Sequence, residues 1–272
     1  MTFVPGLLKD KVAFVAGGTS GINLGIATAL GEFGARVAVF SRNAERVDRA
    51  TESLVSAGID AKGYVGDVRE YASIERAITT CAEWAGPIDI AVSGAAGNFL
   101  CPANELSSNG FRTVVDIDLN GTFNVLRSAY PHLRRPGASI INISAPQATE
   151  AYFGQVHVSA AKAGVDMLTR SLATEWGHEG IRVNAIVPGP IMDTEGMTRL
   201  AASEEIREAW LQANPMRRFG TAREVANLAL FLCSEAASYV NGAIMHCDGG
   251  QVLGGGRDFS SSWAALKARA RP

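Results

Sequence analysis

Short apolar segments and longer segments of helical pattern alternate along the chain. Six of the apolar runs are continuous, which is typical of strands buried on both faces, and a seventh run at 61–68 is weaker. The seven segments lie at 12–17, 36–40, 61–68, 88–94, 139–144, 181–189 and 243–250. Helical patterns lie at 21–33, 43–57, 71–85, 109–134, 157–176 and 222–234. This alternation predicts an α/β fold with a parallel sheet and helices on both of its faces.

Two regions depart from the alternation, although neither divides the chain, so residues 1–272 are expected to form a single domain. Residues 190–221 contain Pro190, Gly196, Pro215 and Gly220 around a short helical pattern. Long insertions after a strand are often lids, and this one is predicted to be a substrate lid. Residues 254–272 begin with a glycine run and are predicted to be a loosely attached C-terminal tail.

The composition excludes several classes of partner. Hydrophobic residues make up 47% of the 272 residues, enough for a packed core. The formal net charge is −2, without a basic field, so nucleic acid is not an expected partner. No apolar run reaches the length of a membrane span, so a membrane is not expected either. The four cysteines and four histidines show no zinc or disulfide spacing, and no metal is expected.

The chain ends carry no familiar targeting signal. Residues 1–10 lack the charged and then apolar layout of a signal peptide. The last three residues, Ala-Arg-Pro, differ from a peroxisomal signal of the Ser-Lys-Leu type. Unpaired cysteines fit a reducing compartment. These features predict a cytoplasmic protein.

A glycine-rich turn follows the first predicted strand and opens the first predicted helix. The segment AGGTSGINLG places Gly17, Gly21 and Gly25 there. Such a turn lets the backbone approach a pyrophosphate at a helix N-terminus, where the amides and the helix dipole favour anions. It predicts a dinucleotide site formed by Gly17, Thr19, Ser20, Gly21 and Ile22, although an ordinary strand-to-helix connection remains the alternative.

The next two strand ends extend this predicted site. Ser41 and Arg42 follow the second strand without an acidic residue, so Arg42 is predicted to bind the 2′-phosphate of NADP(H). Asp67 and Val68 end the third strand and are predicted to contact the adenine. The alternatives are a solvated arginine at the start of a helix and a helix-capping aspartate.

The order of motifs resembles the short-chain dehydrogenase/reductase family from about residue 8 to residue 253. The motifs are AGGTSG (16–21), GDV (66–68), SGAAG (93–97), the helix of Lys162 and PGPIMDT (188–194). The resemblance implies a Rossmann fold with a seven-stranded parallel sheet, a nicotinamide cofactor and a homotetramer or homodimer. It also assigns Gly94, Lys162, Pro188, Gly189 and Ile191 to the cofactor.

The usual catalytic set of that family is incomplete here. Only the lysine, Lys162, is retained. The tyrosine position holds Val158, the serine position holds Ala145 (or Ser144 in a shifted register), and the asparagine position holds Asp118. Since valine carries no transferable proton, the resemblance argues against carbonyl reduction by the family's standard mechanism.

Several stretches of the sequence resemble one branch that also lacks the tyrosine, the 2,4-dienoyl-CoA reductases, and in particular the peroxisomal type. They are residues 93–107, 114–125, 159–177 and 187–200. The resemblance implies an NADPH-dependent reductase of an acyl-CoA thioester with Asp118 and Lys162 as the catalytic pair. Asn98 is predicted to bind the thioester oxygen, Phe99 the acyl chain and Arg199 a CoA phosphate, while Gln147 occupies the tyrosine position of the mitochondrial type.

Other interpretations remain open at this point. Asp118 and Lys162 could form a structural ion pair, and Tyr152 or His157 could donate the proton. The chain could be an oxidoreductase for another carbonyl or alcohol. It could also be an inactive NADP-binding protein, although the retention of Asn98, Asp118 and Lys162 argues against this.

Overall fold

The computed structural model describes residues 3–200 and 203–253, and for residues 198–200 it describes the backbone alone. The predicted tail, 254–272, lies outside the described residues. All seven predicted strands are present: β1 (Val12–Ala16), β2 (Arg36–Ser41), β3 (Ala61–Val65), β4 (Ile90–Ser93), β5 (Ser139–Ile143), β6 (Arg182–Pro188) and β7 (Ile244–Cys247). The α-helices are α1 (Gly21–Glu32), α2 (Ala44–Ser56), α3 (Tyr71–Ala85), α4 (Ser108–Val115), α5 (Gly121–Ala129), α6 (Val156–Trp176), α7 (Glu195–Leu200), α8 (Glu204–Ala213) and α9 (Ala222–Cys233).

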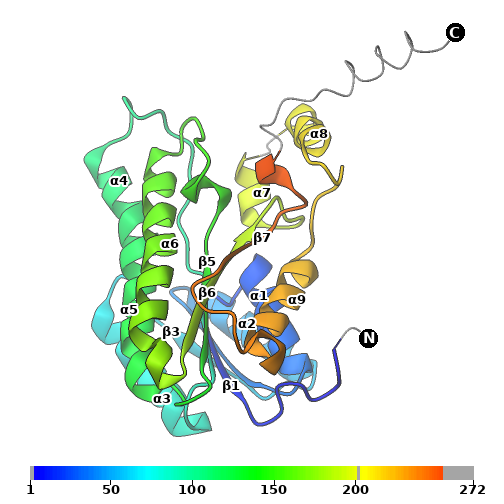
Figure 1. Cartoon of the computed structure of the whole chain (residues 1–272). Helices are drawn as coiled ribbons and strands as arrows, with labels where there is room; N and C mark the ends of the chain where they lie inside the picture. Colours follow the sequence, from blue (N-terminus) through cyan, green and yellow to red (C-terminus); the bar gives the residue numbers. More distant parts are fainter. Residues whose placement is uncertain (1–2, 201–202, 254–272) are drawn as a thin grey trace, which may run out of the picture.

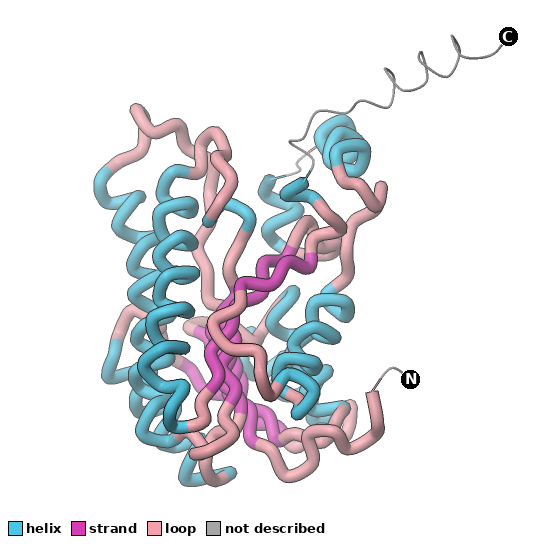
Figure 2. The backbone as a smooth tube through the Cα atoms, in the orientation of Figure 1, coloured by secondary structure: helices cyan, strands magenta, loops and turns pink. Residues whose placement is uncertain are grey.

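The strands form one parallel sheet in the order β3-β2-β1-β4-β5-β6-β7. Figure 1 shows α3, α4, α5 and α6 on one side of this sheet and α1, α2 and α9 on the other. The same three layers appear in Figure 2, where the strands run between two groups of helices. The arrangement is a doubly wound Rossmann fold, which confirms the predicted fold class.

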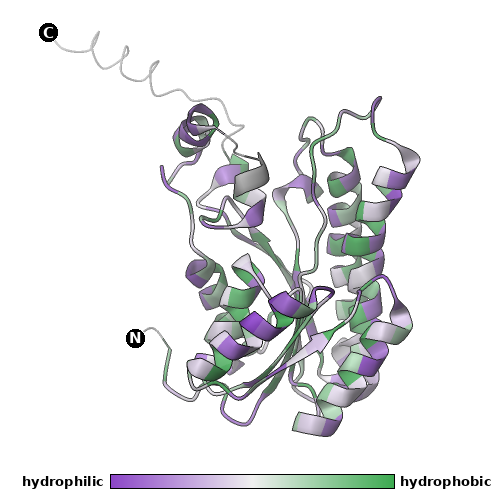
Figure 3. Ribbon diagram, turned by 180° about the vertical axis from the view of Figure 1, so that it is seen from behind, coloured by the Kyte–Doolittle hydropathy of each residue, from purple (hydrophilic) through white to green (hydrophobic). Residues whose placement is uncertain are grey.

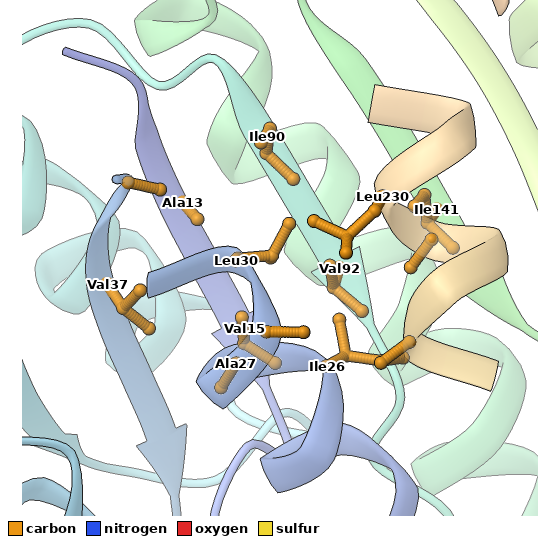
Figure 4. Close-up of a cluster of buried hydrophobic side chains, with 14 of the residues drawn as sticks. Ala13, Val15, Ile26, Ala27, Leu30, Val37, Ile90, Val92, Ile141 and Leu230 are labelled. Carbon is orange, nitrogen blue, oxygen red and sulfur yellow. The ribbon is translucent and has the colours of Figure 1, made fainter. Parts of the chain in front are cut away.

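Both faces of the sheet are buried, which explains why its strands have continuous apolar sequences. In β1 every residue is buried; Ala13 and Val15 face α1, α2 and α9, whereas Val12, Phe14 and Ala16 face the other helix layer. Figure 4 shows the first cluster, where Leu30 and Leu230 pack over Val15 and Val92. Figure 3 shows hydrophobic positions along the sheet and hydrophilic positions on the outer surfaces of the helices.

The helical segment predicted at 109–134 is not one regular helix. A π-helical turn, η1 (Asp116–Asn120), joins α4 to α5 and contains Asp118. The α-helix ends at Ala129 because Pro131, which has no backbone N–H, lies in the short 3-10 turn that follows. Turns of the π type often occur at functional sites, where they displace a side chain from the regular helical face.

The insertion at 190–221 contains two short helices, α7 and α8. Its ends are held together where Ile191 and Gly220 pair in a β-bridge. Asn214 is buried and donates from Nδ2 to the Asp248 carbonyl, 2.8 Å away, which attaches the end of α8 to the segment after β7. None of the residues of α8 is buried, so this helix is weakly packed.

Candidate active site

The predicted cofactor residues lie beside the carboxyl ends of the parallel strands. Ala16, Ser93 and Asn142 are in register across β1, β4 and β5, so the loops after these strands begin side by side. The chain order reverses between β1 and β4, which makes this the topological switch point of the sheet. Ligands of doubly wound proteins bind at this point, outside the carboxyl ends of the strands.

The glycine turn adopts a conformation that depends on glycine. Gly17 has a φ of +77°, and a Cβ at this position would lie 2.8 Å from the Ala95 nitrogen. Gly21 has a φ of +52° and begins α1. Ser20 is the N-cap residue, but within the described part of the chain its side chain makes no capping hydrogen bond. The first amides of α1 are therefore suited to an anionic group.

In the glycine motif of the family that the sequence resembles, T-G-x-x-x-G-x-G, the last glycine corresponds to Asn23 of this chain. Its side chain is buried, and Nδ2 donates to the Gly94 carbonyl at 2.7 Å. This hydrogen bond links the first turn of α1 to the end of β4, two segments that both belong to the predicted cofactor site. The departure from the motif therefore leaves the turn in place and adds a connection across it.

The residues predicted at the adenosine end lie at the tips of β2 and β3. Arg42 is exposed immediately after β2, beside Ser41. Asp67 accepts from Arg69 and forms an ion pair with it at 2.6 Å. The hydrogen bonds from Arg69, with a smaller contribution from the charge of Arg42, hold the pKa of Asp67 below its usual value. Val68 is buried.

Asp118 and Lys162 form a buried ion pair between η1 and α6. Asp118 Oδ2 lies 3.2 Å from Lys162 Nζ, and the relative exposures of the two residues are 0% and 4%. Asp118 Oδ1 accepts from the Gly97 N–H at 2.7 Å, and Lys162 Nζ donates to the Ile143 carbonyl at 2.9 Å. The pair is therefore attached to the loop after β4 and to the end of β5.

Asp118 Oδ2 has capacity for a further hydrogen bond. It is close enough to Lys162 for an ion pair, but among the described residues it accepts no directed hydrogen bond. A buried carboxylate oxygen without such a bond is costly unless another group completes its environment.

A cavity of about 490 Å³ connects the predicted residues. Asp118, Lys162 and Asn98 all line it. From the predicted cofactor set, its wall also contains Ile22, Pro188, Gly189 and Ile191. The cavity thus brings the predicted catalytic residues to the same space as part of the predicted cofactor site, and its size suits a small-molecule ligand.

The predicted substrate residues are placed differently from one another. Asn98 lines the cavity from the loop after β4. The ring of Phe99 stacks on His157, with centroids 4.4 Å apart, and Phe99 is not among the residues that line the cavity. Arg199 lies in α7, but its side chain is outside the described part of the structure.

The two other candidate proton donors, Tyr152 and His157, lie in different surroundings. Tyr152 lines the cavity, and burial raises the pKa of its hydroxyl, which favours the neutral phenol. His157 is fully buried and does not line the cavity; burial lowers its pKa, so the ring is neutral at pH 7. Val158 lines the cavity from the first turn of α6 and packs with Val114 and Ala161.

Sequence reasoning did not identify Gln155 as a site residue. It is the N-cap residue of α6, is only 2% exposed and lines the cavity. Its Nε2 donates to Asn98 Oδ1 at 2.9 Å and to the Phe99 carbonyl at 2.8 Å. A glutamine before a helix is an ordinary surface residue in sequence, and only the path of the distant 97–99 loop gives it this role.

Comparison with known proteins agrees with the geometry. A family model described as enoyl-(acyl carrier protein) reductase matches residues 16–251. A peroxisomal 2,4-dienoyl-CoA reductase from Pongo abelii is 44% identical over 253 residues, which cover 92% of this chain and 87% of the relative. A short chain dehydrogenase from Bacillus anthracis superposes with a TM-score of 0.80 at 40% identity, covering 90% of this chain and 97% of the other. A gluconate 5-dehydrogenase from Burkholderia cenocepacia, solved with NADP and tartrate, has a TM-score of 0.86 at 29% identity and covers 90% and 96%.

These relatives contradict the predicted cytoplasmic location, which is wrong. Several similar proteins, including those from Pongo abelii and Danio rerio, are named as peroxisomal enzymes. The prediction rested on the missing Ser-Lys-Leu type address and on unpaired cysteines, which fit any reducing compartment and do not single out the cytoplasm. In the described residues, no helix is both long enough and apolar enough to span a membrane.

The family model spans residues 16–251, and the Pongo abelii relative matches over 92% of the chain, so both comparisons cover nearly all of the fold described above. The chain belongs to the short-chain dehydrogenase/reductase family of oxidoreductases.

Proposed function

We propose that the protein is an NADPH-dependent reductase of 2,4-dienoyl-CoA or a related enoyl-CoA thioester. The observation that carries this proposal is the buried Asp118–Lys162 pair in the wall of a cavity where the tyrosine position holds Val158. The reaction named for the Pongo abelii relative supports this substrate class. The homodimer or homotetramer implied by the resemblance stays a prediction.

The residues of the glycine turn fit a nicotinamide dinucleotide. A Cβ at Gly17 would fill the space beside Ala95, so only glycine leaves the backbone open to a pyrophosphate. In this proposal Gly17, Thr19, Ser20, Gly21 and Ile22 hold the pyrophosphate end. The remaining contacts come from the strand ends, namely Ser41, Arg42, Asp67, Val68, Gly94, Pro188, Gly189 and Ile191, together with Lys162.

The chemistry places different demands on three side chains. When bound, the reduced nicotinamide supplies a hydride to the conjugated chain of the substrate. The electron pair displaced from the double bonds moves to the thioester oxygen, where the Asn98 amide donates a hydrogen bond. A carbon of the resulting dienolate then takes up a proton, which comes from Asp118 when its carboxyl is protonated, or from a water molecule that the ionised carboxylate orders. Lys162 supplies positive charge beside both groups.

The direct test is oxidation of NADPH in the presence of a panel of acyl-CoA thioesters. The panel contains 2,4-dienoyl, 2-enoyl and saturated acyl-CoA, together with simple ketones and alcohols. The proposal expects turnover of the conjugated thioesters and none of the saturated one. Turnover restricted to ketones and alcohols would replace it with a conventional dehydrogenase, and a protein that binds NADPH but turns over no substrate would replace it with a binding role.

Replacing Arg42 with alanine should remove a preference for NADPH over NADH. Arg42 is exposed at the tip of β2, where it can meet the 2′-phosphate with two hydrogen bonds. Losing a charge-assisted contact of about 1.5–3 kcal/mol corresponds to a roughly tenfold to hundredfold loss of NADPH affinity. Binding titrations of both cofactors measure it. Arg49→Ala, an exposed arginine of α2, is the control, and equal affinity of the wild type for the two cofactors would refute the assignment.

The segment 190–221 is proposed to be a substrate lid. It contributes Pro190, Ile191, Thr194, Gly196, Met197, Ile206 and Trp210 to the wall of the cavity. The last two belong to α8, a helix without buried residues, so ligand contacts would add substantially to its packing.

Addition of NADPH and acyl-CoA should slow amide hydrogen exchange within α7 and α8. The C-terminal part of the segment provides an internal control, because Gly220 in its bridge and the Asn214–Asp248 contact are already fixed, and none of these three residues is proposed to touch a ligand. Exchange there should change little. Unchanged exchange throughout 195–213 with both ligands bound would contradict the lid assignment.

A further inference from the structure

Gln155 holds the loop after β4 from the start of α6. Although it is the N-cap residue of this helix, its side chain makes no capping hydrogen bond. Nε2 instead donates to Asn98 Oδ1 at 2.9 Å and to the Phe99 carbonyl oxygen at 2.8 Å, with the Gly154 carbonyl oxygen as a longer contact at 3.5 Å. Because the side chain is 2% exposed, water does not compete effectively for these contacts.

The backbone carbonyl of Phe99 determines the direction of the neighbouring amides. A carbonyl oxygen can only accept, so the Gln155 atom that faces it must be the nitrogen. The same nitrogen faces Asn98, whose nearest atom must therefore be Oδ1. Gln155 Oε1 then faces Gln147 Nε2, which donates to it at 3.3 Å. One backbone group thus sets the orientation of a series of three side-chain amides.

This series has a consequence at the cavity. With Oδ1 of Asn98 engaged by Gln155, Nδ2 lies on the other branch of the amide. A reversed amide would direct an oxygen lone pair to the place where the thioester oxygen gains negative charge. The donor would then become a repulsive group, and loss of one oxyanion donor lowers turnover by about 10²–10³ in well-studied enzymes.

A second side chain from the same turn of α6 supports the loop. His157 Nε2 lies 3.1 Å from the Phe99 carbonyl oxygen, and its ring stacks on Phe99. Since a carbonyl accepts only at that oxygen, Nε2 carries the proton. The carbonyl therefore accepts from both Gln155 and His157, but only Gln155 also contacts Asn98.

We propose that Gln155 is a positioning residue that holds the oxygen of the Asn98 amide toward α6, so that the N–H side of this amide, and not its oxygen, faces the thioester oxygen of the substrate. This inference rests on the proposed reduction of a conjugated acyl-CoA. It assigns to Gln155 a role in transition-state stabilisation that acts through Asn98.

The test is a double-mutant cycle on the rate constant of single-turnover hydride transfer. Gln155→Glu keeps the size but places carboxylate oxygens against two acceptors, and Gln155→Met removes all polar contacts. Each should lower the rate constant roughly tenfold to hundredfold while NADPH affinity stays unchanged, on the scale of a misdirected oxyanion donor. In an Asn98→Ala background the same changes should cost less than about threefold. An equal loss in both backgrounds, or no loss in the wild-type background, would overturn the proposal.

His157→Gln separates amide orientation from general support of the loop. This substitution disturbs a contact with Phe99 but none with Asn98. It should therefore change the rate constant of hydride transfer by the same factor with or without the Asn98 side chain. If the effect of His157→Gln also disappears in the Asn98→Ala background, the loop as a whole is responsible and the specific role of Gln155 is refuted.

A measurement without substrate distinguishes failure of this inference from failure of the proposed function. In Gln155→Glu only the protonated carboxyl can donate to the Phe99 carbonyl, so folding should raise the pKa of the new group. The folded state then binds protons more readily, and the stability of the variant relative to wild type should rise as the pH falls from about 8 to about 5. Relative stability that is flat or falls over this range refutes the amide orientation, even if dienoyl-CoA is reduced. If the relative stability rises as the pH falls but the wild type turns over no thioester, the amide orientation is supported and the proposed function is rejected.

Discussion

Asp118→Asn should lower turnover by about a hundredfold or more, the usual scale for the loss of acid–base catalysis. Asparagine has nearly the same size and keeps an oxygen that can accept from the Gly97 N–H, so the loop after β4 should stay in place. What is lost is the ionisable oxygen Oδ2 beside Lys162, in a residue that lines the cavity. Affinity for NADPH should change little, because Asp118 is not among the residues proposed to touch the cofactor.

A purely structural ion pair predicts a different result for the same variant. Removing the charge of Asp118 would leave Lys162 buried without its partner, so stability and NADPH affinity would fall together while folded molecules kept partial activity. Melting temperature, NADPH affinity and single-turnover hydride transfer on one preparation separate the two models. Near-normal hydride transfer and product formation would remove Asp118 from the mechanism and leave Tyr152 as the next donor to test, since it lines the cavity.

Lys162→Met should cost both stability and cofactor use. The methionine replaces most of the aliphatic stem but leaves the Asp118 carboxylate buried without a cation and the Ile143 carbonyl without its donor. Breaking a buried pair from one side typically costs about 3–5 kcal/mol of unfolding free energy. Urea unfolding measures this loss, and titration should show weaker NADPH binding, because Lys162 is also among the residues proposed to contact the cofactor.

The double variant Asp118→Asn with Lys162→Met is the matched control. It removes the unpaired charge, so much of the stability lost in Lys162→Met should return. Turnover should not return, since both polar groups of the proposed chemistry are absent. If the single Lys162→Met variant is as stable as wild type, the pair is solvated in solution and the argument from burial fails.

Much of the fold could be predicted because it depends on local properties of the chain. The continuous apolar run at 12–17 predicts a strand covered on both faces, and β1 is buried on both faces. The glycine turn was predictable for a similar reason, since Gly17 needs a positive φ and a missing Cβ. Helix positions followed from periodicity, but the π-helical turn at Asp116–Asn120 did not, because a regular periodic pattern continues across it.

The candidate site was accessible from sequence only through the resemblance. Lys162 and Asp118 are far apart in the chain, and composition or spacing gives no sign that they meet. Their contact depends on the packing of α6 against the turn that contains Asp118, which is a property of the assembled helices. For Phe99, the structure shows a ring stacked on His157, a contact between distant segments that its motif does not encode.

Gln155 marks the limit of what the amino-acid sequence alone can specify here. Before a helix, a polar residue is expected to cap the first amides or to face water, and both expectations come from local chemistry. The side chain instead crosses to Asn98 and Phe99, because the loop after β4 passes over the start of α6 only once the sheet and its helices have assembled. Strand order, burial and local turns follow from periodicity and residue type. The direction of one buried amide depends on a distant carbonyl that tertiary packing brings within 2.8 Å of it.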